Sequence, residues 1–173
     1  MLNNLLPNQY EKSIYSIDLH ALRDKGIKGI ITDLDNTLVE WDRPKATPEV
    51  KKWFEQLNEF GMKVTIVSNN NSKRVKEFAE PEGIFFIHAA KKPLGKAFRQ
   101  ACQEMQVNRD EVVVIGDQIF TDVLGGNRAG LHTILVVPVS SSDGLATQLN
   151  RRMERVVLRW MKKRGMIEWE DKK

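Results

Sequence analysis

The sequence predicts an α/β fold in which a parallel sheet of about five strands carries helices on both faces. Two features lead to this prediction. Short, nearly continuous apolar runs alternate with longer amphipathic runs, which is the pattern of βαβ units. Clusters of polar residues follow the apolar runs directly, as they do where ligands bind at the carboxyl ends of parallel strands.

The expected strands are the apolar runs that turn-forming residues bound. They cover residues 27–32, 63–67, 84–87, 112–115 and 132–136. The expected helices lie between them, at residues 48–60, 72–78, 94–104 and 121–128. Pro48 suits a first helical turn, Gly61 follows a helix and Gly130 precedes the last strand. The connections between parallel strands are expected to be right-handed. Because the strands are parallel, their carboxyl ends lie at one edge of the sheet.

The length of 173 residues favours one domain with terminal extensions. We expect a domain at 1–150, built from a motif core at 27–137 and an N-terminal extension at 1–26, followed by a tail at 151–173. The hydrophobic content of 41% and the charged content of 29% are ordinary for a globular protein, and the apolar runs are too short to span a bilayer.

The N-terminus and the cysteine content predict a cytoplasmic protein. The first residues contain neither a basic leader nor a long apolar segment, so we expect no secretory signal. Cys102 is the single cysteine of the chain. It excludes an internal disulfide, offers no zinc cluster and fits a reducing cytosol.

The tail carries the net positive charge of the chain. Residues 151–173 contribute +5 to the formal net charge of +4, from nine Lys and Arg against four Asp and Glu, which leaves −1 for the rest. Helical spacing in this part predicts a cationic amphipathic helix over 151–164. Its apolar line is Leu149, Met153, Val156 and Trp160, and its basic line is Arg151, Arg155, Arg159 and Lys162.

Two placements of this helix stay open. Its apolar line can pack on the body while the arginines are solvated, or the helix can lie on an anionic bilayer, peripheral at the inner face of the membrane. A near-neutral body with a cationic end differs from a uniformly basic nucleic-acid binder. Nucleic acid is therefore the least favoured partner.

Four polar clusters follow four of the expected strands. They are residues 33–37, 68–70, 91–93 and 116–122. In a parallel sheet all of them converge at one edge. A sheet core alone does not require hydroxyl groups, lysine and paired carboxylates at successive strand ends, so their coincidence indicates a functional site.

The carboxylates of these clusters predict a metal site. Asp33 and Asp35 lie two residues apart, so their side chains point to the same side if the strand continues through them. Asp117 and Asp122 bring more negative charge to the same edge. A hard divalent cation with oxygen ligands compensates such charge, and Mg²⁺ is the expected ion because it tolerates few carboxylates, several waters and a phosphate oxygen.

The cationic and hydroxyl groups at this edge suit a bound phosphoryl group. Lys92, Ser68 and the backbone amides near Asn36 and Thr37 can hold its charge and donate hydrogen bonds to its oxygens. A carboxylate nucleophile then allows hydrolysis in two steps, through an acyl phosphate. The expected partner is therefore a phosphorylated substrate.

In order and spacing these clusters resemble the four motifs of the haloacid dehalogenase (HAD) superfamily. The matching residues are the run 33–38, Ser68, the Lys92–Pro93 pair, and Gly116–Asp117 with Thr121–Asp122. The resemblance covers about residues 27–137 and implies a Rossmann-like HAD fold. The intervals between the motifs hold little more than one loop and one helix each, so a large cap domain is not expected.

The resemblance also implies a role for each matching residue. Asp33 corresponds to the nucleophile and a metal ligand, and Asp35 to the general acid and base whose backbone carbonyl also ligates the metal. Asp117 and Asp122 correspond to the remaining metal-site acids. The expected phosphate-binding residues are Thr37, Ser68, Asn69 and Lys92. Lys91 stays open as an alternative to Lys92, and Asn69 and Asn70 can instead form a turn and a helix cap.

A set of softer signals extends over nearly the whole chain: Leu6–Pro7, Ser16–Ile17, residues 26–30, Trp41 and residues 90–94. These signals resemble the YqeG-like phosphatases of the HAD-IIIA class, which are related to the mitochondrial phosphatidylglycerophosphate phosphatases. This resemblance implies the conversion of phosphatidylglycerophosphate to phosphatidylglycerol. An open site without a cap suits such a bulky lipid phosphate.

Two other functions stay open. One is a phosphatase of a soluble metabolite or of a nucleic-acid end, which would use the same site. The other is a non-enzymatic scaffold that binds phosphate. The presence of both Asp33 and Asp35 disfavours the scaffold, because a binding module does not need both a nucleophile and an acid.

Overall fold

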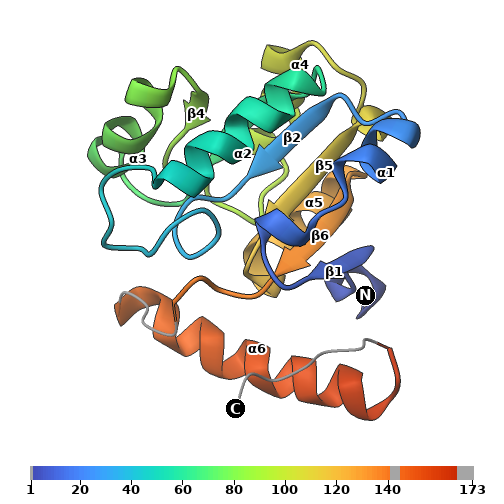
Figure 1. Cartoon of the computed structure of the whole chain (residues 1–173). Helices are drawn as coiled ribbons and strands as arrows, with labels where there is room; N and C mark the ends of the chain where they lie inside the picture. The colour runs from blue at the N-terminus through green and yellow to red at the C-terminus, as the bar shows by residue number, and fades with distance from the viewer. Residues whose placement is uncertain (1, 141–144, 167–173) are drawn as a thin grey trace.

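The computed structural model describes residues 2–140 and 145–166, and of residues 2 and 145–152 it describes the backbone only. Parallel strands form one six-stranded sheet in the order β1-β6-β5-β2-β3-β4, with helices on both faces (Figure 1). The strands are β1 Gln9–Glu11, β2 Gly29–Thr32, β3 Lys63–Val67, β4 Phe85–Ile87, β5 Val112–Gly116 and β6 His132–Val136. The expected fold class is confirmed, and the described residues contain no large cap domain.

The helices agree with the expected ranges to within a few residues, with additions near both ends of the chain. The α-helices are α1 Leu19–Asp24, α2 Pro48–Glu59, α3 Ser72–Ala79, α4 Lys96–Met105, α5 Leu124–Ala129 and α6 Leu145–Lys163. Single turns of 3-10 helix are η1 Leu2–Leu5, η2 Ile14–Ser16, η3 Glu80–Glu82 and η4 Arg109–Glu111, and η5 Ile119–Val123 is a π-helical turn. The helix expected at 121–128 is therefore divided between the π-helical turn η5 and the short helix α5.

The sixth strand, β1, comes from the N-terminal extension and was not predicted. It pairs parallel to β6, with Tyr10 opposite Leu135. Its three residues are half-buried and show no apolar alternation, so the local sequence gives no strand signal. Asn8 fixes the register, because its amide N donates to the carbonyl O of Thr133 (3.0 Å) and its Oδ1 accepts from the amide N of Thr133 (2.8 Å).

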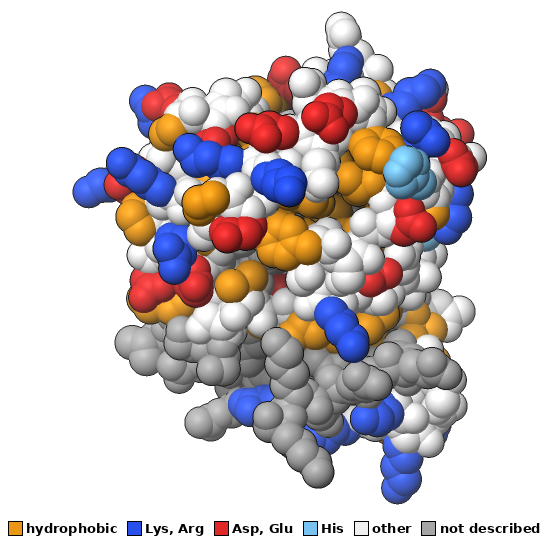
Figure 2. Space-filling view, viewed as in Figure 1, with side chains coloured by type: hydrophobic (Ala, Val, Ile, Leu, Met, Phe, Trp, Pro, Cys, Tyr) orange, Lys and Arg blue, Asp and Glu red, His pale blue; other side chains and the backbone are white. Residues whose placement is uncertain are grey.

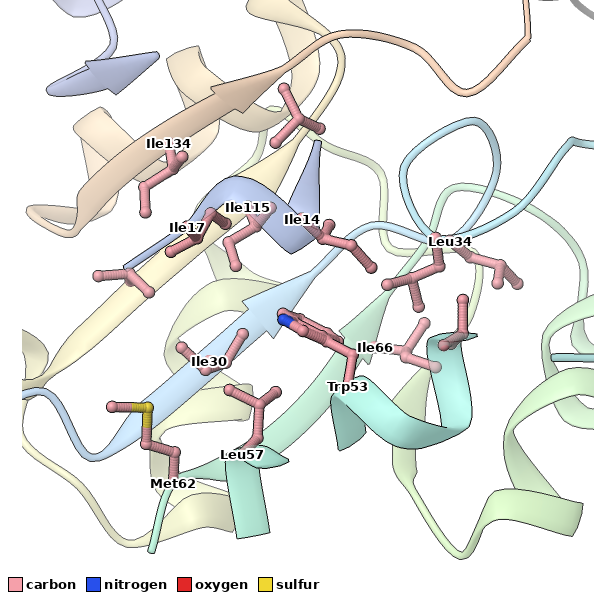
Figure 3. Packing of buried hydrophobic residues seen from close by; sticks show 14 of the residues in the cluster. Ile14, Ile17, Ile30, Leu34, Trp53, Leu57, Met62, Ile66, Ile115 and Ile134 are labelled. Atoms are coloured by element: carbon pink, nitrogen blue, oxygen red, sulfur yellow. The ribbon is translucent and has the colours of Figure 1, made fainter. Parts of the chain in front are cut away.

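The centre of the sheet is apolar on both faces. Every residue of β2 and β5 is buried, and Ile30 and Ile31 belong to the cores on opposite faces because side chains alternate along a strand. Figure 3 shows Trp53 and Leu57 of α2 beside Ile30 and Ile66 of the sheet. This packing fixes the central strands, so the loops at their carboxyl ends leave from a rigid base.

The helix α6 lies across the lower end of the sheet in Figure 1 and contains the amphipathic helix expected at 151–164. Two residues of the apolar line predicted for that helix, Met153 and Val156, do not pack on the body. Met153 and Val156 are 47% and 65% exposed, whereas Glu154 and Met161 are buried. The side chains of Leu149 and Arg151, which belong to the predicted lines, lie outside the described residues.

Within the part of the chain that the structure describes, no helix combines the length and the apolar composition needed to cross a bilayer.

The packing of α2 predicts a large loss of stability on truncation of Leu57, which is fully buried in the core. We expect Leu57→Ala to lower the free energy of unfolding by about 2–5 kcal/mol, because it removes buried apolar contacts and leaves a cavity. Urea unfolding followed by circular dichroism measures this. Gln56→Ala, on the exposed side of the same helix, is the control, with a change within about 0.5 kcal/mol. Equal effects of the two variants would contradict this packing.

Candidate active site

Asp33 occupies the position directly after β2, at the edge where the strands end. Its amide N donates to the carbonyl O of Ile115 (2.9 Å), so the ladder between β2 and β5 continues up to Asp33. The chain then turns sharply at Asn36, which has a positive φ of 63° and donates its amide N–H to the carbonyl O of Val39 (2.7 Å). Asparagine tolerates this left-handed conformation better than most residues. The turn keeps Asp33, Asp35 and Thr37 close together at the sheet edge.

Lys92 lies at the centre of a buried charge cluster. Its Nζ is 2.9 Å from Oδ1 of Asp33 and 2.7 Å from Oδ1 of Asp122. Burial lowers the pKa of Lys92, but the carboxylates of Asp122 and Asp33 outweigh this effect, and the net pKa is raised. Lys92 is therefore a permanent cation in the site, whereas its neighbour Lys91 is exposed.

The side chain of Asn69 forms two hydrogen bonds with the backbone of Lys92. The Asn69 side chain accepts from the amide N of Lys92 (2.7 Å) and donates to the carbonyl O of the same residue (3.2 Å). The buried Ser68 hydroxyl accepts from the amide N of Asn70 (3.1 Å). The second polar cluster thus lies beside Lys92, as the parallel sheet predicts.

Three buried carboxylates face one another beside Lys92. Each of Asp33, Asp117 and Asp122 has an oxygen within 4.8 Å of an oxygen of the other two. The Thr37 hydroxyl donates to Oδ1 of Asp117 (2.8 Å). The pKa of Asp122 is raised to about 7, because burial and the charges of Asp33 and Asp117 together outweigh the lowering effect of Lys92.

The donor set of this cluster fits a divalent cation. Three carboxylates and one ammonium leave a charge of −2 when all are ionised. Carboxylate oxygens are the ligands that Mg²⁺ and other hard cations prefer. Burial is the largest cause of the raised pKa of Asp122, and repulsion from Asp33 and Asp117, which a bound divalent cation would reduce, adds to it. Asp33, Asp117 and Asp122 are therefore the residues that would hold the metal ion.

Gly116 is required where Asp122 returns to the sheet. A Cβ at Gly116 would lie 2.2 Å from Cγ of Asp122, far inside van der Waals contact. Asp122 is brought there by the π-helical turn η5 and held by the amide N of Gln118, which donates to its Oδ2 (3.1 Å). The Gly116–Asp117 pair at the end of β5 therefore has two functions, since the glycine leaves room for Asp122 and the next residue supplies another acid.

Asp35 belongs to a different polar group. It is not part of the three-carboxylate cluster, and its two oxygens bind residues that follow β3. Oδ2 accepts from Nδ2 of Asn70 (2.9 Å), and Oδ1 accepts from Nε of Arg74 (3.0 Å). Burial is the largest effect on the pKa of the Asp35 carboxyl and raises it. The hydrogen bond from Asn70 and the charge of Arg74 lower this pKa, whereas the negative charge of Asp33 raises it. The net pKa is above the usual range of a carboxyl group.

Arg74 is the residue of this site that the sequence reasoning missed. It lies in the first turns of α3, outside the four motif positions, where an arginine normally reads as a solvated helix residue. The signal available in the sequence was the excess of acids over cations at the sheet edge, which calls for one more cation. The structure otherwise brings together the predicted residues Asp33, Thr37, Ser68, Asn69, Lys92, Asp117 and Asp122.

A separate cavity of about 660 Å³ lies at the other end of the sheet. It is lined by residues that include Phe54, Met62, Lys63 and Glu104. Lys63 begins β3 and Ser68 follows its last residue, so the length of this strand separates the cavity from the carboxylates. The charge cluster is therefore at a sheet edge formed by loops, remote from this hollow.

Residues 14–130 match the family model of the haloacid dehalogenase-like hydrolases. The chain belongs to this family. The match spans the motif region in which Asp33, Ser68, Lys92 and Asp117 meet at one edge. The HAD membership inferred from the four motifs is confirmed.

Curated relatives agree with this membership. The HAD chain is 58% identical over 166 residues to a probable phosphatase, YqeG, of Bacillus subtilis (strain 168), with 96% of each chain covered. It is 30% identical over 171 residues to the chloroplastic/mitochondrial phosphatidylglycerophosphate phosphatase 1 of Arabidopsis thaliana, a match that covers 92% of this chain and 49% of the plant protein. The chain thus spans about half the length of that relative. The expectation of a HAD-type phosphatase is confirmed.

Solved structures share the fold at low sequence identity. A cobalt-bound deoxy-D-mannose-octulosonate 8-phosphate phosphatase of Haemophilus influenzae superposes with a TM-score of 0.55 and 16% identity, covering 84% of this chain and 95% of that one. A putative β-phosphoglucomutase of Thermotoga maritima gives a TM-score of 0.55 and 14% identity, covering 72% and 91%. These similarities support the HAD fold.

The charge cluster predicts that Mg²⁺ stabilises the protein more at high pH than at low pH. The pKa of Asp122 is about 7 in the folded metal-free protein, against 3.8 for an unperturbed carboxyl. Between these values the folded state binds more protons, so the stability of the metal-free protein falls as pH rises. Because metal ligands must be ionised, we expect a larger melting-temperature increase from Mg²⁺ at about pH 8 than at about pH 5.5. Differential scanning fluorimetry with Mg²⁺ or a chelator measures it.

Asp117→Asn is the control for this measurement, because it removes one carboxylate of the cluster. The Mg²⁺ effect should be strongly reduced in this variant at both pH values. An equal Mg²⁺ effect at the two pH values in the wild type would contradict the assignment of the cluster as the metal site.

Proposed function

We propose that this HAD hydrolase is a Mg²⁺-dependent phosphomonoesterase that forms an aspartyl-phosphate on Asp33 and acts on phosphatidylglycerophosphate. The observation that carries the proposal is the cluster of Asp33, Asp117 and Asp122 around Lys92, with Asp35 beside it. It offers a nucleophile, an acid, a cation to bind phosphate and a set of metal ligands at one edge.

In the first step, a carboxylate oxygen of Asp33 attacks phosphorus and the bond from phosphorus to the ester oxygen breaks. The proton of Asp35 passes to the departing oxygen, so that the alcohol leaves neutral. Lys92 holds the negative charge of the phosphoryl oxygens, with Ser68 and the backbone near Thr37 as further donors. We propose that Asn69 contributes to phosphate binding by holding the backbone of Lys92.

In the second step, Asp35 acts as the base. It takes a proton from a water molecule whose oxygen attacks phosphorus, and the bond between phosphorus and Asp33 breaks. Inorganic phosphate leaves and Asp33 is restored. A Mg²⁺ ion bound by Asp33, Asp117, Asp122 and the backbone carbonyl of Asp35 would supply charge neutralisation for the phosphoryl group.

Exposed apolar side chains on the loops of the catalytic edge support a lipid substrate. Trp41, Leu94 and Val139 are 40%, 59% and 49% exposed. Trp41 follows the turn at Asn36, Leu94 lies two residues after Lys92, and the amide N of Val139 donates to the carbonyl O of Asn36 (2.8 Å). Apolar side chains gathered around a polar site suit contact with a membrane or lipid surface.

The charge of α6 supports a peripheral position on an anionic membrane, at its inner face in the cytoplasm. Figure 2 shows blue Lys and Arg side chains over the described part of this helix. Its acid, Glu154, is buried and accepts the amide N–H of Phe120 (3.1 Å). Met153 and Val156 point away from the body, and exposed basic residues such as Arg155 flank them. This arrangement offers apolar and cationic contacts on one surface.

Membrane contact through α6 predicts that Val156→Glu weakens binding to anionic vesicles. The change removes an exposed apolar side chain and adds a negative charge, so we expect roughly tenfold weaker binding to phosphatidylglycerol vesicles. Vesicle cosedimentation measures it. Phe85→Glu is the matched control, because Phe85 is 44% exposed on β4. Equal binding by wild type and Val156→Glu would remove α6 as the contact.

The mechanism predicts that Asp33→Asn abolishes turnover while the protein stays folded. We expect a loss in kcat of roughly 10³-fold or more, because the amide is a poor nucleophile. Phosphate release from phosphatidylglycerophosphate in mixed micelles with Mg²⁺ measures it, and thermal unfolding checks the fold. Unchanged activity in Asp33→Asn would refute the mechanism.

A substrate panel tests the lipid assignment separately. The wild type should turn over phosphatidylglycerophosphate far faster than sugar phosphates, nucleotides or 5′-phosphorylated oligonucleotides. Equal or faster turnover of a soluble phosphate would favour a metabolite or nucleic-acid-end phosphatase on the same site. No turnover of any phosphate ester, with retained phosphate binding, would favour the scaffold.

A further inference from the structure

Asp35 is held by side chains that come from outside its own loop. Nε of Arg74 lies 3.0 Å and Nη2 of Arg74 lies 2.9 Å from Oδ1 of Asp35. Nδ2 of Asn70 lies 2.9 Å from Oδ2. Both donors belong to the segment that follows β3, the strand next to β2. Each carboxylate oxygen of Asp35 thus has a fixed donor.

Arg74 is itself immobilised. Its amide N donates to Oδ1 of Asn71, the residue that caps α3 (3.0 Å). Its Nη1 donates to the carbonyl O of Pro44 (3.4 Å), and its guanidinium lies over the ring of Phe78, 5.8 Å from the centroid. The side chain is only 13% exposed. Because the guanidinium is planar and fixed on several sides, it can hold a partner in one orientation.

Arg74 and Lys92 form ion pairs with different acids. Arg74 pairs with Asp35, whereas Lys92 pairs with Asp33 and Asp122. The site therefore divides into a metal and phosphate part around Lys92 and an acid–base part around Arg74. A residue that acts on Asp35 should influence proton transfer and leave the phosphate and metal contacts in place.

We infer that Arg74 is a positioning residue for the general acid of the reaction, an inference that rests on the proposed role of Asp35. The Nε–H group of Arg74 donates to Oδ1 of Asp35, and the charged Nη2 lies 2.9 Å from the same oxygen, so the transferred proton is carried by Oδ2, which has Asn70 as its neighbour. As the phosphorus–oxygen bond breaks, this proton passes from Oδ2 to the departing oxygen. Arg74 keeps its bonds to Oδ1 and stabilises the carboxylate that results.

This role predicts that the effect of an Arg74 substitution depends on the leaving group. Nitrophenolate is a stable anion and departs with little help from an acid, whereas the alkoxide of an alkyl phosphate requires a proton. We expect Arg74→Ala to lower kcat/KM for glycerol phosphate by about 10²-fold and for p-nitrophenyl phosphate by less than about 3-fold. kcat/KM reports the step that transfers the phosphoryl group to Asp33.

The experiment uses the full chain with saturating Mg²⁺ and four variants. Arg74→Ala is the main variant. Arg74→Lys keeps the positive charge but loses the planar guanidinium, so its kcat/KM for glycerol phosphate should lie between those of Arg74→Ala and the wild type. Lys73→Ala is the matched control, because Lys73 is the exposed neighbour of Arg74 on α3. It should leave both substrates unchanged. Asp35→Asn should show the leaving-group dependence at full strength.

The outcomes separate this inference from the proposed mechanism. If Asp35→Asn shows the dependence and Arg74→Ala loses equally on both substrates, or loses only through KM, Arg74 is not a positioning residue and the mechanism stands. If Asp35→Asn itself loses equally on both substrates, Asp35 is not the acid and both ideas fail. If Arg74→Ala does not fold, as judged by thermal unfolding, Arg74→Lys decides by the same comparison.

Discussion

The imbalance of charge around Lys92 is the constraint on which the rest of this structure depends. Three buried carboxylates meet one ammonium, and burial prevents water from screening their repulsion. A fold holds such a group only if the backbone positions every member and something compensates the remaining charge. The parallel sheet does the first, because the ends of β2, β3 and β5 meet at one edge. A divalent cation suits the second.

The elements near this edge show how the positioning is achieved. Asn36 adopts a positive φ that turns the chain after Asp33, and Gly116 leaves the space that the side chain of Asp122 fills. The π-helical turn η5 brings Asp122 back to the sheet, and the buried Glu154 of α6 accepts a hydrogen bond from the same turn. α6 is thereby connected to this edge of the sheet on one side, while Met153, Arg155 and Val156 remain exposed on the other. The same helix can thus support both the site and a surface contact.

Much of the fold could be predicted from the sequence because the central strands are buried on both faces. β3 and β6 have the expected bounds, since continuous apolar runs between turn residues leave few alternatives. β1 could not be predicted, because three half-buried residues form a strand only through pairing with β6. In the site, the acids could be predicted because they follow the expected strands directly in the sequence. The contact between Arg74 and Asp35 could not, because it depends on the position of α3 relative to Asp35. The face of α6 that packs on the body could not be predicted either, because Met161, which is buried, lies outside the apolar line that the spacing predicts.

The central claim is that the phosphoryl group of the substrate passes through Asp33. The most direct test is acid quenching of the enzyme during turnover of phosphatidylglycerophosphate with Mg²⁺, followed by peptide mapping with mass spectrometry. The account predicts a phosphorylated peptide that contains Asp33 in the wild type and no phosphorylated peptide in Asp33→Asn. Turnover by the wild type without a phosphorylated Asp33 peptide, or a phosphoryl group on another residue, would contradict it.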